Sequence, residues 1–297
     1  MLAGSCSRVP RGFESLRYET RLRTSSDNVR VPFTLAHGAA VLPFRGSRLV
    51  FPALLVGSFA PDFEYFFRLN PSGRFGHTLL GVFVLDLPLS VFVLWLYHSF
   101  VSLPVAKLLP TRFAHRLADP GKENIFGGVR GFTLIMISIF VGVMTHIAWD
   151  SLTHRNTWPY RHWRVLSQAV SLPILGSIPC YKVLQHGSTI LGLAIFATWL
   201  LMRYWASPGP DPNFRSSTTS MRKVVITLAI LGVATIGAVV RSLLVVGPPV
   251  GPSAEKQFVG VSVVTSIALI WWELVAYGVF LSCASQRVGP ARDETGV

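Results

Sequence analysis

The 297-residue sequence has few charged residues and few cysteines. Asp, Glu, Lys and Arg make up 14% of it, whereas a soluble domain carries about 25%. The three cysteines, Cys6, Cys180 and Cys283, lie far apart and form no CxxC pair, so no disulfide framework is indicated. The net charge is +13, but no RRM, zinc-finger or helix-turn-helix signature accompanies it. Nucleic acid is therefore not a predicted partner.

Long apolar runs replace the missing charge, since 51% of the residues are hydrophobic. A helix needs about 20 apolar residues to cross a bilayer. Five runs are predicted to span: His77–Val101, Gly131–Trp149, Gly187–Leu201, Val224–Val240 and Phe258–Ser282. The basic residues lie mainly between these runs, where they meet lipid phosphates. The sequence predicts an all-α polytopic membrane bundle of about five to six transmembrane helices.

The sixth span, Leu49–Phe67, is a weaker prediction. Four residues interrupt its apolar pattern: Pro52, Pro61, Asp62 and Glu64. The segment before it, Phe33–Phe44, is too short to span. We expect that segment to form a short amphipathic helix that lies at the interface or re-enters the membrane.

The two ends of the chain differ from the rest. Residues 1–30 hold six Arg and no apolar stretch, so they are neither a signal peptide nor an anchor. The string from Gly4 to Arg17 resembles the translated end of a bacterial tRNA gene, which predicts a start called too far upstream and a true start at Val31. A disordered cytoplasmic tail is the alternative. Residues 286–297 are predicted to be a disordered tail.

Threading the runs back and forth across the membrane gives a prediction of sidedness. The side that holds the C-terminus carries eleven basic residues in its loops, and the opposite side carries eight. Positive charge favours the cytoplasmic side, so the C-terminus is predicted to be cytoplasmic.

The stretch His146-Ile-Ala-Trp-Asp150-Ser-Leu-Thr-His154 places three ionisable residues at four-residue steps at the end of an uncharged run. On a helix they share one face, about 5–6 Å apart at Cβ. Ionisable groups at membrane depth are unfavourable and usually functional. The same threading of the runs across the membrane places three further ionisable residues on that side: Asp62, His77 and His186. His37 joins them if its short segment packs there.

Imidazole nitrogen and carboxylate oxygen together suit Zn, Mn or Fe. An ion with an open coordination position lowers the pKa of bound water and so supplies a nucleophile for hydrolysis. Other interpretations stay open at this point. His146 could instead hydrogen-bond between helices, Asp62 could cap a short helix, and His154 could be an ordinary loop residue.

Five motifs, in this order, resemble the bacterial membrane protein family of unknown function DUF4184: Pro32–Pro43, Gly57–Phe66, Gly73–Gly81, His146–His154 and Leu184–Thr189. The resemblance covers residues 31–205, with additional transmembrane helices in 206–285. The order of His, Pro-Asp, His and His-x-x-x-Asp is also similar to membrane-bound metal-dependent hydrolases of the YdjM and DUF457 type, and more distantly to zinc-dependent phospholipase C.

The resemblance implies a divalent metal ion, zinc above all and manganese or iron as alternatives, in a bacterial cytoplasmic membrane protein. It implies five metal ligands: His37, Asp62, His77, His146 and Asp150. We therefore expect a hydrolase that acts on a phospholipid or other phosphoester at the membrane surface.

Four further residues are assigned supporting roles in this hydrolase. His186 or His154 would complete the coordination sphere or transfer a proton, and Arg74 or Arg155 would hold phosphate oxygens. The alternative function is a non-enzymatic membrane protein, either a cation or proton transporter or a structural scaffold.

Overall fold

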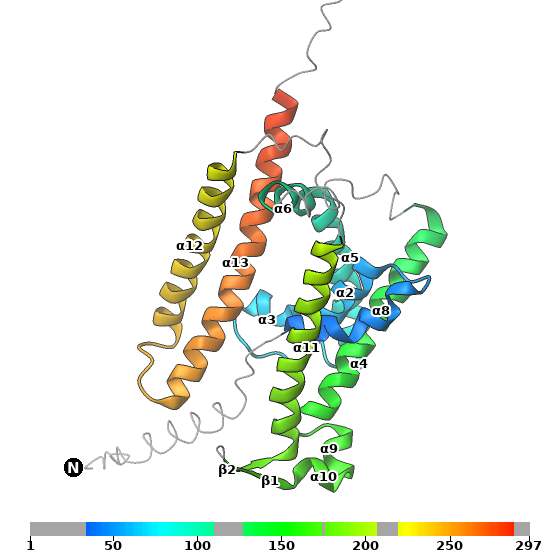
Figure 1. Ribbon diagram of the computed structural model, residues 1–297, viewed down its shortest axis with the longest axis vertical. Helices are drawn as coiled ribbons and strands as arrows, with labels where there is room; N and C mark the ends of the chain where they lie inside the picture. The colour runs from blue at the N-terminus through cyan, green and yellow to red at the C-terminus, as the bar shows by residue number, and fades with distance from the viewer. Residues whose placement is uncertain (1–33, 110–126, 174–175, 207–218, 288–297) are drawn as a thin grey trace, which may run out of the picture.

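The computed structural model describes residues 34–109, 127–173, 176–206 and 219–287 (Figure 1). The prediction for residues 1–30 and that for residues 288–297 of the predicted tail lie outside these ranges, whereas Gln286 and Arg287, predicted as tail, are the last residues of a helix. The described chain is almost entirely helical, as predicted. It adds one antiparallel hairpin, in which β1 (Ala169–Leu172) pairs with β2 (Gly176–Pro179).

Five helical segments are long and apolar enough to cross a membrane, and they coincide with the five predicted runs. Their bounds are Leu79–Leu108, Gly128–His162, Cys180–Trp205, Ser220–Val245 and Pro252–Ala284. The next three contain the helices α8 (Gly128–Thr153), α11 (Cys180–Trp205) and α12 (Ser220–Val245), and the last is most of α13 (Pro252–Arg287). These four alternate in direction along the long axis (Figure 1). The polytopic bundle is therefore confirmed.

The first span is divided into five consecutive pieces. They are α4 (Leu79–Gly81), the π-helical turn η3 (Val82–Asp86), α5 (Leu87–Leu96), the π-helical turn η4 (Tyr97–Val101) and α6 (Ser102–Leu108). Pro88 and Pro104 follow the two π turns. A proline lacks the N–H that would close the helical bond and its ring clashes with the carbonyl four residues earlier. The wider π turns relieve this conflict at both places.

The weak sixth run does not form a spanning helix. It is divided at Pro61 into α2 (Phe51–Phe59), a 3-10 turn η2 (Ala60–Asp62) and α3 (Phe63–Arg68). The segment predicted as a short N-terminal helix is η1 (Thr34–Gly46), a long 3-10 helix. Its residues Ala36, His37, Gly38 and Ala39 are buried against α2 and α11, so η1 lies inside the bundle.

Two glycines allow α2 to pack tightly against α8. A Cβ built on Gly57 would collide with the backbone carbonyl of Ile139, and one on Gly142 would collide with the carbonyl of Leu54. Small residues allow such close backbone approach where apolar packing holds helices together. The core forms around this contact, from residues of α2, η2, the first span and α8: Ala53, Ala60, Val82, Leu87, Leu94, Ile135, Ile139 and Val143.

We expect Gly142→Val to lower the free energy of unfolding by about 1–3 kcal/mol, the usual effect of overpacking a well-packed core. Thermal unfolding in detergent measures the loss. Gly232→Ala in α12 is the matched control, because a Cβ there meets nothing within 4 Å. Equal melting temperatures for the two variants would contradict the close α2–α8 contact.

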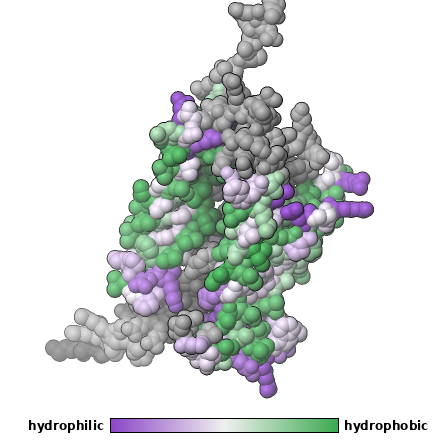
Figure 2. Space-filling view, viewed as in Figure 1, coloured by the Kyte–Doolittle hydropathy of each residue, from purple (hydrophilic) through white to green (hydrophobic). Residues whose placement is uncertain are grey.

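The outer surface is apolar over much of its length. Figure 2 shows hydrophobic residues over the visible faces of α11 and α12 and hydrophilic residues gathered toward the ends. On α12, Val225, Leu228 and Ile236 are each more than half exposed. Large exposed apolar faces mark contact with a partner or with lipid. Below α8 in Figure 1, the short helices α9 (Trp158–His162) and α10 (Arg164–Ser167) and the hairpin form the end nearest the site described next.

Candidate metal centre

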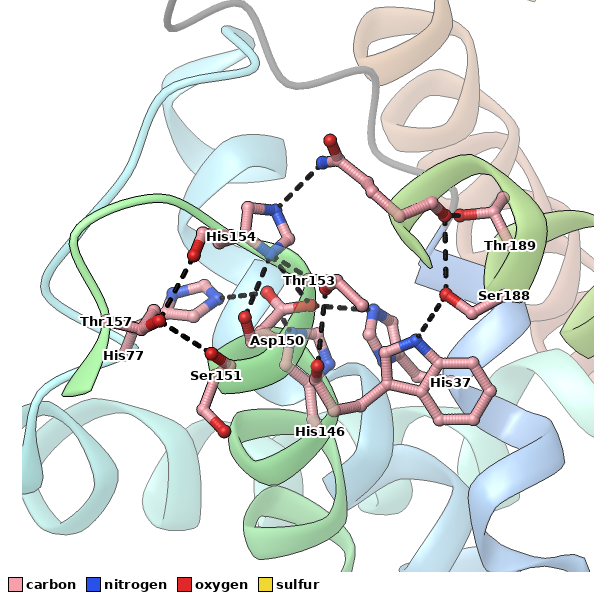
Figure 3. A network of polar contacts seen from close by, with 12 residues as sticks. His37, His77, His146, Asp150, Ser151, Thr153, His154, Thr157, Ser188 and Thr189 are labelled. Carbon is pink, nitrogen blue, oxygen red and sulfur yellow. Dashed lines mark hydrogen bonds and ion pairs between the residues drawn. The ribbon is translucent and has the colours of Figure 1, made fainter. Parts of the chain in front are cut away.

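Five predicted ligands meet inside the bundle, delivered by four separate segments. His37 comes from η1, Asp62 from the end of η2, and His77 from the turn before α4. His146 and Asp150 lie one turn apart on α8. Figure 3 shows the rings of His37, His77 and His146 around Asp150, together with that of His154. The sequence predicts that these residues lie on one side of the membrane, and in the structure they lie next to one another.

The donor atoms lie at the spacing that one ion imposes on its ligands. Asp150 Oδ2 lies 3.3 Å from His77 Nε2 and 3.5 Å from His146 Nε2. Asp62 Oδ1 lies 3.9 Å from His77 Nε2 and 3.8 Å from His146 Nε2. Ligands at zinc distances sit roughly 3.4 Å apart in a tetrahedron. The observed distances are close to that value.

Two overlapping groups of residues could each hold an ion. One consists of His37, Asp62 and His146, and the other of His77, His146 and Asp150, with the donor atoms of each group within 4.8 Å of one another. His146 belongs to both groups. His37 Nε2 also lies 3.5 Å from Asp150 Oδ1, and its ring stacks on His146 at 3.8 Å between centroids.

Two buried ring nitrogens that make no hydrogen bond fit a cation. Nε2 of His77 and Nε2 of His146 are buried and have no hydrogen-bond partner among the described residues. Buried polar atoms without a partner are rare in folded proteins. Desolvation by burial, with a smaller effect from the neighbouring His146, lowers the pKa of His37 to about 4, so this ring is neutral and has a lone pair to give. A divalent ion between these atoms would satisfy them.

Backbone and side-chain groups behind the cluster fix its orientation. His146 Nδ1 lies 2.7 Å from the Ser58 carbonyl oxygen. Because that oxygen can only accept, Nδ1 carries the proton and the Nε2 lone pair faces the cluster. Thr34 donates a hydrogen bond of 2.7 Å to Asp62 Oδ2, which leaves Oδ1 turned toward His77 and His146.

Glu64 holds the turn that carries His77. Its Oε2 accepts hydrogen bonds from the backbone N–H of Phe75 at 2.9 Å and of Gly76 at 3.4 Å. Its Oε1 pairs with the exposed Arg68 at 2.6 Å. The carboxylate is buried and fully engaged, so it positions the ligand turn from behind and does not join the donors.

His154 lies at the rim of the cluster. Its Nδ1 is 3.4 Å from Asp150 Oδ1 and 3.2 Å from the Asp150 carbonyl. Its Nε2 is 3.2 Å from the side-chain nitrogen of Gln185 on α11. Asp150 thus accepts from Nδ1–H, and Nε2 accepts from the Gln185 amide. The imidazole is held between a ligand and α11.

One family model matches this chain, that of a domain of unknown function, DUF4184, over residues 31–279. The match covers most of the sequence and every residue of the cluster. The chain belongs to the DUF4184 family. The matched region continues past residue 205 through α12 and most of α13. Comparisons with curated proteins and with solved structures give no match.

The remaining predicted residues of this DUF4184 protein lie farther out. His186 is exposed on α11, and no hydrogen bond or ion pair within the described ranges joins it to the cluster. Its neighbour Gln185 faces the cluster instead, because successive helical residues point about 100° apart. Arg74 and Arg155 are exposed in the turns that carry His77 and His154.

Sequence reasoning assigned no role to Asp86, a completely buried carboxylate in the first span. It is the only acidic residue in the otherwise apolar run His77–Val101. A lone charge inside a spanning run was the available signal.

Proposed function

We propose that this DUF4184 protein is a metal-dependent hydrolase that cleaves a phosphoester, in a phospholipid or another substrate at the membrane surface. The observation that carries the proposal is the convergence of three imidazoles and two carboxylates. The buried Nε2 atoms of His77 and His146 make no hydrogen bond and face oxygens of Asp62 and Asp150 at 3.3–3.9 Å. Mixed nitrogen and oxygen donors favour zinc, with manganese or iron as alternatives.

The ring nitrogens of His37, His77 and His146 and the carboxylates of Asp62 and Asp150 would hold the ion. A bound divalent ion supplies Lewis acidity toward a phosphoryl oxygen and lowers the pKa of water. Burial of the donors keeps this chemistry in an environment of low dielectric constant, where charge stabilisation is stronger. Thr34 and the Ser58 carbonyl preset the donor orientations before any ion arrives.

His154 is suited to proton transfer at the edge of the centre. Asp150 orients its ring through Nδ1, in the way that a carboxylate orients a catalytic imidazole. Nε2 faces Gln185, a neutral amide whose contact can open without leaving a buried charge. We infer that His154 moves a proton at Nε2 and that the ligands stay on the ion.

The surface next to His154 supports a membrane-surface substrate. Trp158 and Trp163 are 65% and 48% exposed, and Trp is enriched at membrane–water interfaces. Thr157 joins this segment to the site, because its Oγ1 donates to the Ser151 and His154 carbonyls. The exposed basic residues of the same stretch can bind phosphate oxygens: Arg155, Arg161 and Arg164. Membrane lipid is the partner that this chemistry fits.

Hydrolysis is tested with detergent-purified protein loaded with zinc or manganese, a phosphodiester reporter, and vesicles containing phospholipid. We expect metal-dependent release of product, and about 10²–10⁴-fold slower turnover in His154→Ala. His162→Ala is the control, because His162 is exposed and stacks on Trp158 outside the cluster. Product release that does not depend on the metal, or none with any phosphoester, would refute the hydrolase.

A structural metal site is the second candidate. His146 is completely buried, and five donors suffice to close a tetrahedral shell, as structural sites do. Metal that is retained without any hydrolysis would select this function.

A further inference from the structure

Asp86 is a carboxylate that the proposed ligand set does not use. It is 0% exposed, and neither of its oxygens has a partner among the described residues. An isolated carboxylate away from water is strongly unfavourable. An ionisable residue inside a spanning segment therefore points to a function, and its partner has to be sought nearby.

The first span directs Asp86 into the core. Val82, Asp86, Ser90 and Leu94 follow one another at four-residue steps, and all four are buried. Asp86 is the last residue of the π turn η3, and π turns are frequent at functional sites. The stripe that faces the other helices thus contains one acidic group.

Asp86 packs directly behind the two turns that present ligands. A Cβ built on Gly76 would lie 3.1 Å from Asp86 Oδ1 and 2.6 Å from the Pro61 carbonyl. Gly76 precedes His77, and Pro61 precedes Asp62. The absence of a side chain at Gly76 lets the Pro61 carbonyl approach this closely and brings Asp86 into contact with the turn.

His77 lacks the acceptor that a metal-binding histidine requires. Its Nε2 faces Asp150 at 3.3 Å, while its Nδ1 is buried and has no partner among the described residues. A ligating histidine normally donates its other N–H to a carboxylate or carbonyl, which fixes the ring and raises its basicity. His146 has such an acceptor in the Ser58 carbonyl.

The other acidic groups near this turn are already engaged. Glu64 accepts two backbone N–H groups and pairs with Arg68. Asp62 and Asp150 face the Nε2 atoms. Among the described acidic residues beside this turn, Asp86 is the one whose oxygens have no hydrogen-bond or ion-pair partner.

We propose that Asp86 is a positioning residue of the metal centre. Neither the Asp86 carboxylate nor the His77 Nδ1 has a direct partner among the described residues, so Asp86 accepts from Nδ1–H of His77 through one bridging water and holds Nε2 toward the ion. It also adds a negative charge behind a cationic site. This inference rests on the proposed metal site.

The test compares Asp86→Leu and Asp86→Asn with wild-type protein. Glu273→Gln is the matched control, since Glu273 is another carboxylate in a span, on α13, whose oxygens have no partner among the described residues. Zinc affinity is measured by competition with a chromophoric chelator, coordination by the visible spectrum of the cobalt-loaded protein, and folding by the melting temperature of the metal-free protein.

Asp86→Leu is expected to weaken zinc binding about 10–100-fold, the usual effect of losing an outer partner of a metal ligand, and to change the cobalt spectrum. Asp86→Asn is expected to weaken it less, because the amide oxygen still accepts. The metal-free Asp86→Leu protein should melt close to wild type, because the change removes a desolvated carboxylate and leaves the His77 N–H without an acceptor, two effects of opposite sign. Glu273→Gln should bind zinc with wild-type affinity.

The possible outcomes distinguish the role of Asp86 from the existence of the metal site. Wild-type protein that binds no metal overturns both. If the wild-type protein binds zinc and Asp86→Leu binds it with the same affinity and the same cobalt spectrum, only the role of Asp86 is overturned. If Asp86→Leu does not fold, the Asp86→Asn variant provides the test. Wild-type zinc affinity and an unchanged cobalt spectrum in Asp86→Asn would then overturn the positioning role of Asp86. Equal losses in Glu273→Gln would also overturn it, because they would indicate a general packing effect.

Discussion

His146→Ala is expected to lower the affinity for zinc by about a hundred- to a thousand-fold. Binding free energies of about 10–16 kcal/mol shared among four ligands give each ligand a few kcal/mol. His146 belongs to both groups of donors, so its loss affects any ion placed in either. The truncation also leaves a cavity at a fully buried position, which is destabilising. His146→Gln keeps most of the volume and separates the two effects.

Equilibrium competition with a chelator measures this loss. His162→Ala serves as the control, because it removes an imidazole from an exposed position. Wild-type zinc affinity in both His146→Ala and His146→Gln would show that the ring is a packing residue with one hydrogen bond to Ser58.

Asp150→Asn is expected to abolish the stabilisation that metal confers. Asp150 lies within 3.5 Å of four imidazoles, those of His37, His77, His146 and His154. Its negative charge is therefore central to the attraction for a cation. Free metal at a thousand times the dissociation constant stabilises a binding protein by about 4 kcal/mol. Asparagine has nearly the same shape and no charge, so the variant should gain little from added metal.

Melting curves with added zinc and with a chelator test this second expectation. The wild-type melting temperature should rise with zinc and fall with the chelator, and the Asp150→Asn melting temperature should stay constant. Glu255→Gln, at an exposed position in the first turn of α13, is the control and should respond like wild type. A full response to zinc in Asp150→Asn would rule out Asp150 as a ligand.

The spanning helices were predictable because membrane-depth helices must be long and apolar, and that requirement is visible in each run separately. The break at Pro61 was also visible, since a proline removes a helical hydrogen bond and kinks or breaks the helix. The 3-10 geometry of η1 was not predictable, because it depends on contacts with α2 and α11. The hairpin of β1 and β2 was missed, since four-residue strands beside prolines carry little pattern.

The ligand set was predictable in part from His and Asp at helix ends and in part from a family resemblance. The hydrogen-bond partners that orient these ligands were not predictable. The acceptor for His146 is the backbone carbonyl of Ser58, 88 residues away, and any residue type has such a carbonyl. The choice between Gln185 and His186 depended on the rotation of α11. Asp86 was visible in the sequence as a lone acid in a spanning run, but its closeness to Gly76 and Pro61 exists only in the folded chain.

The central claim is that the cluster of His37, Asp62, His77, His146 and Asp150 binds a divalent metal ion. Elemental analysis of detergent-purified wild-type protein tests it most directly. The arrangement predicts about one or two zinc, manganese or iron ions per chain, since two donor groups overlap. Clean folded protein that holds no metal, even after reconstitution with each ion, would contradict the claim. The cluster would then be a polar contact between helices.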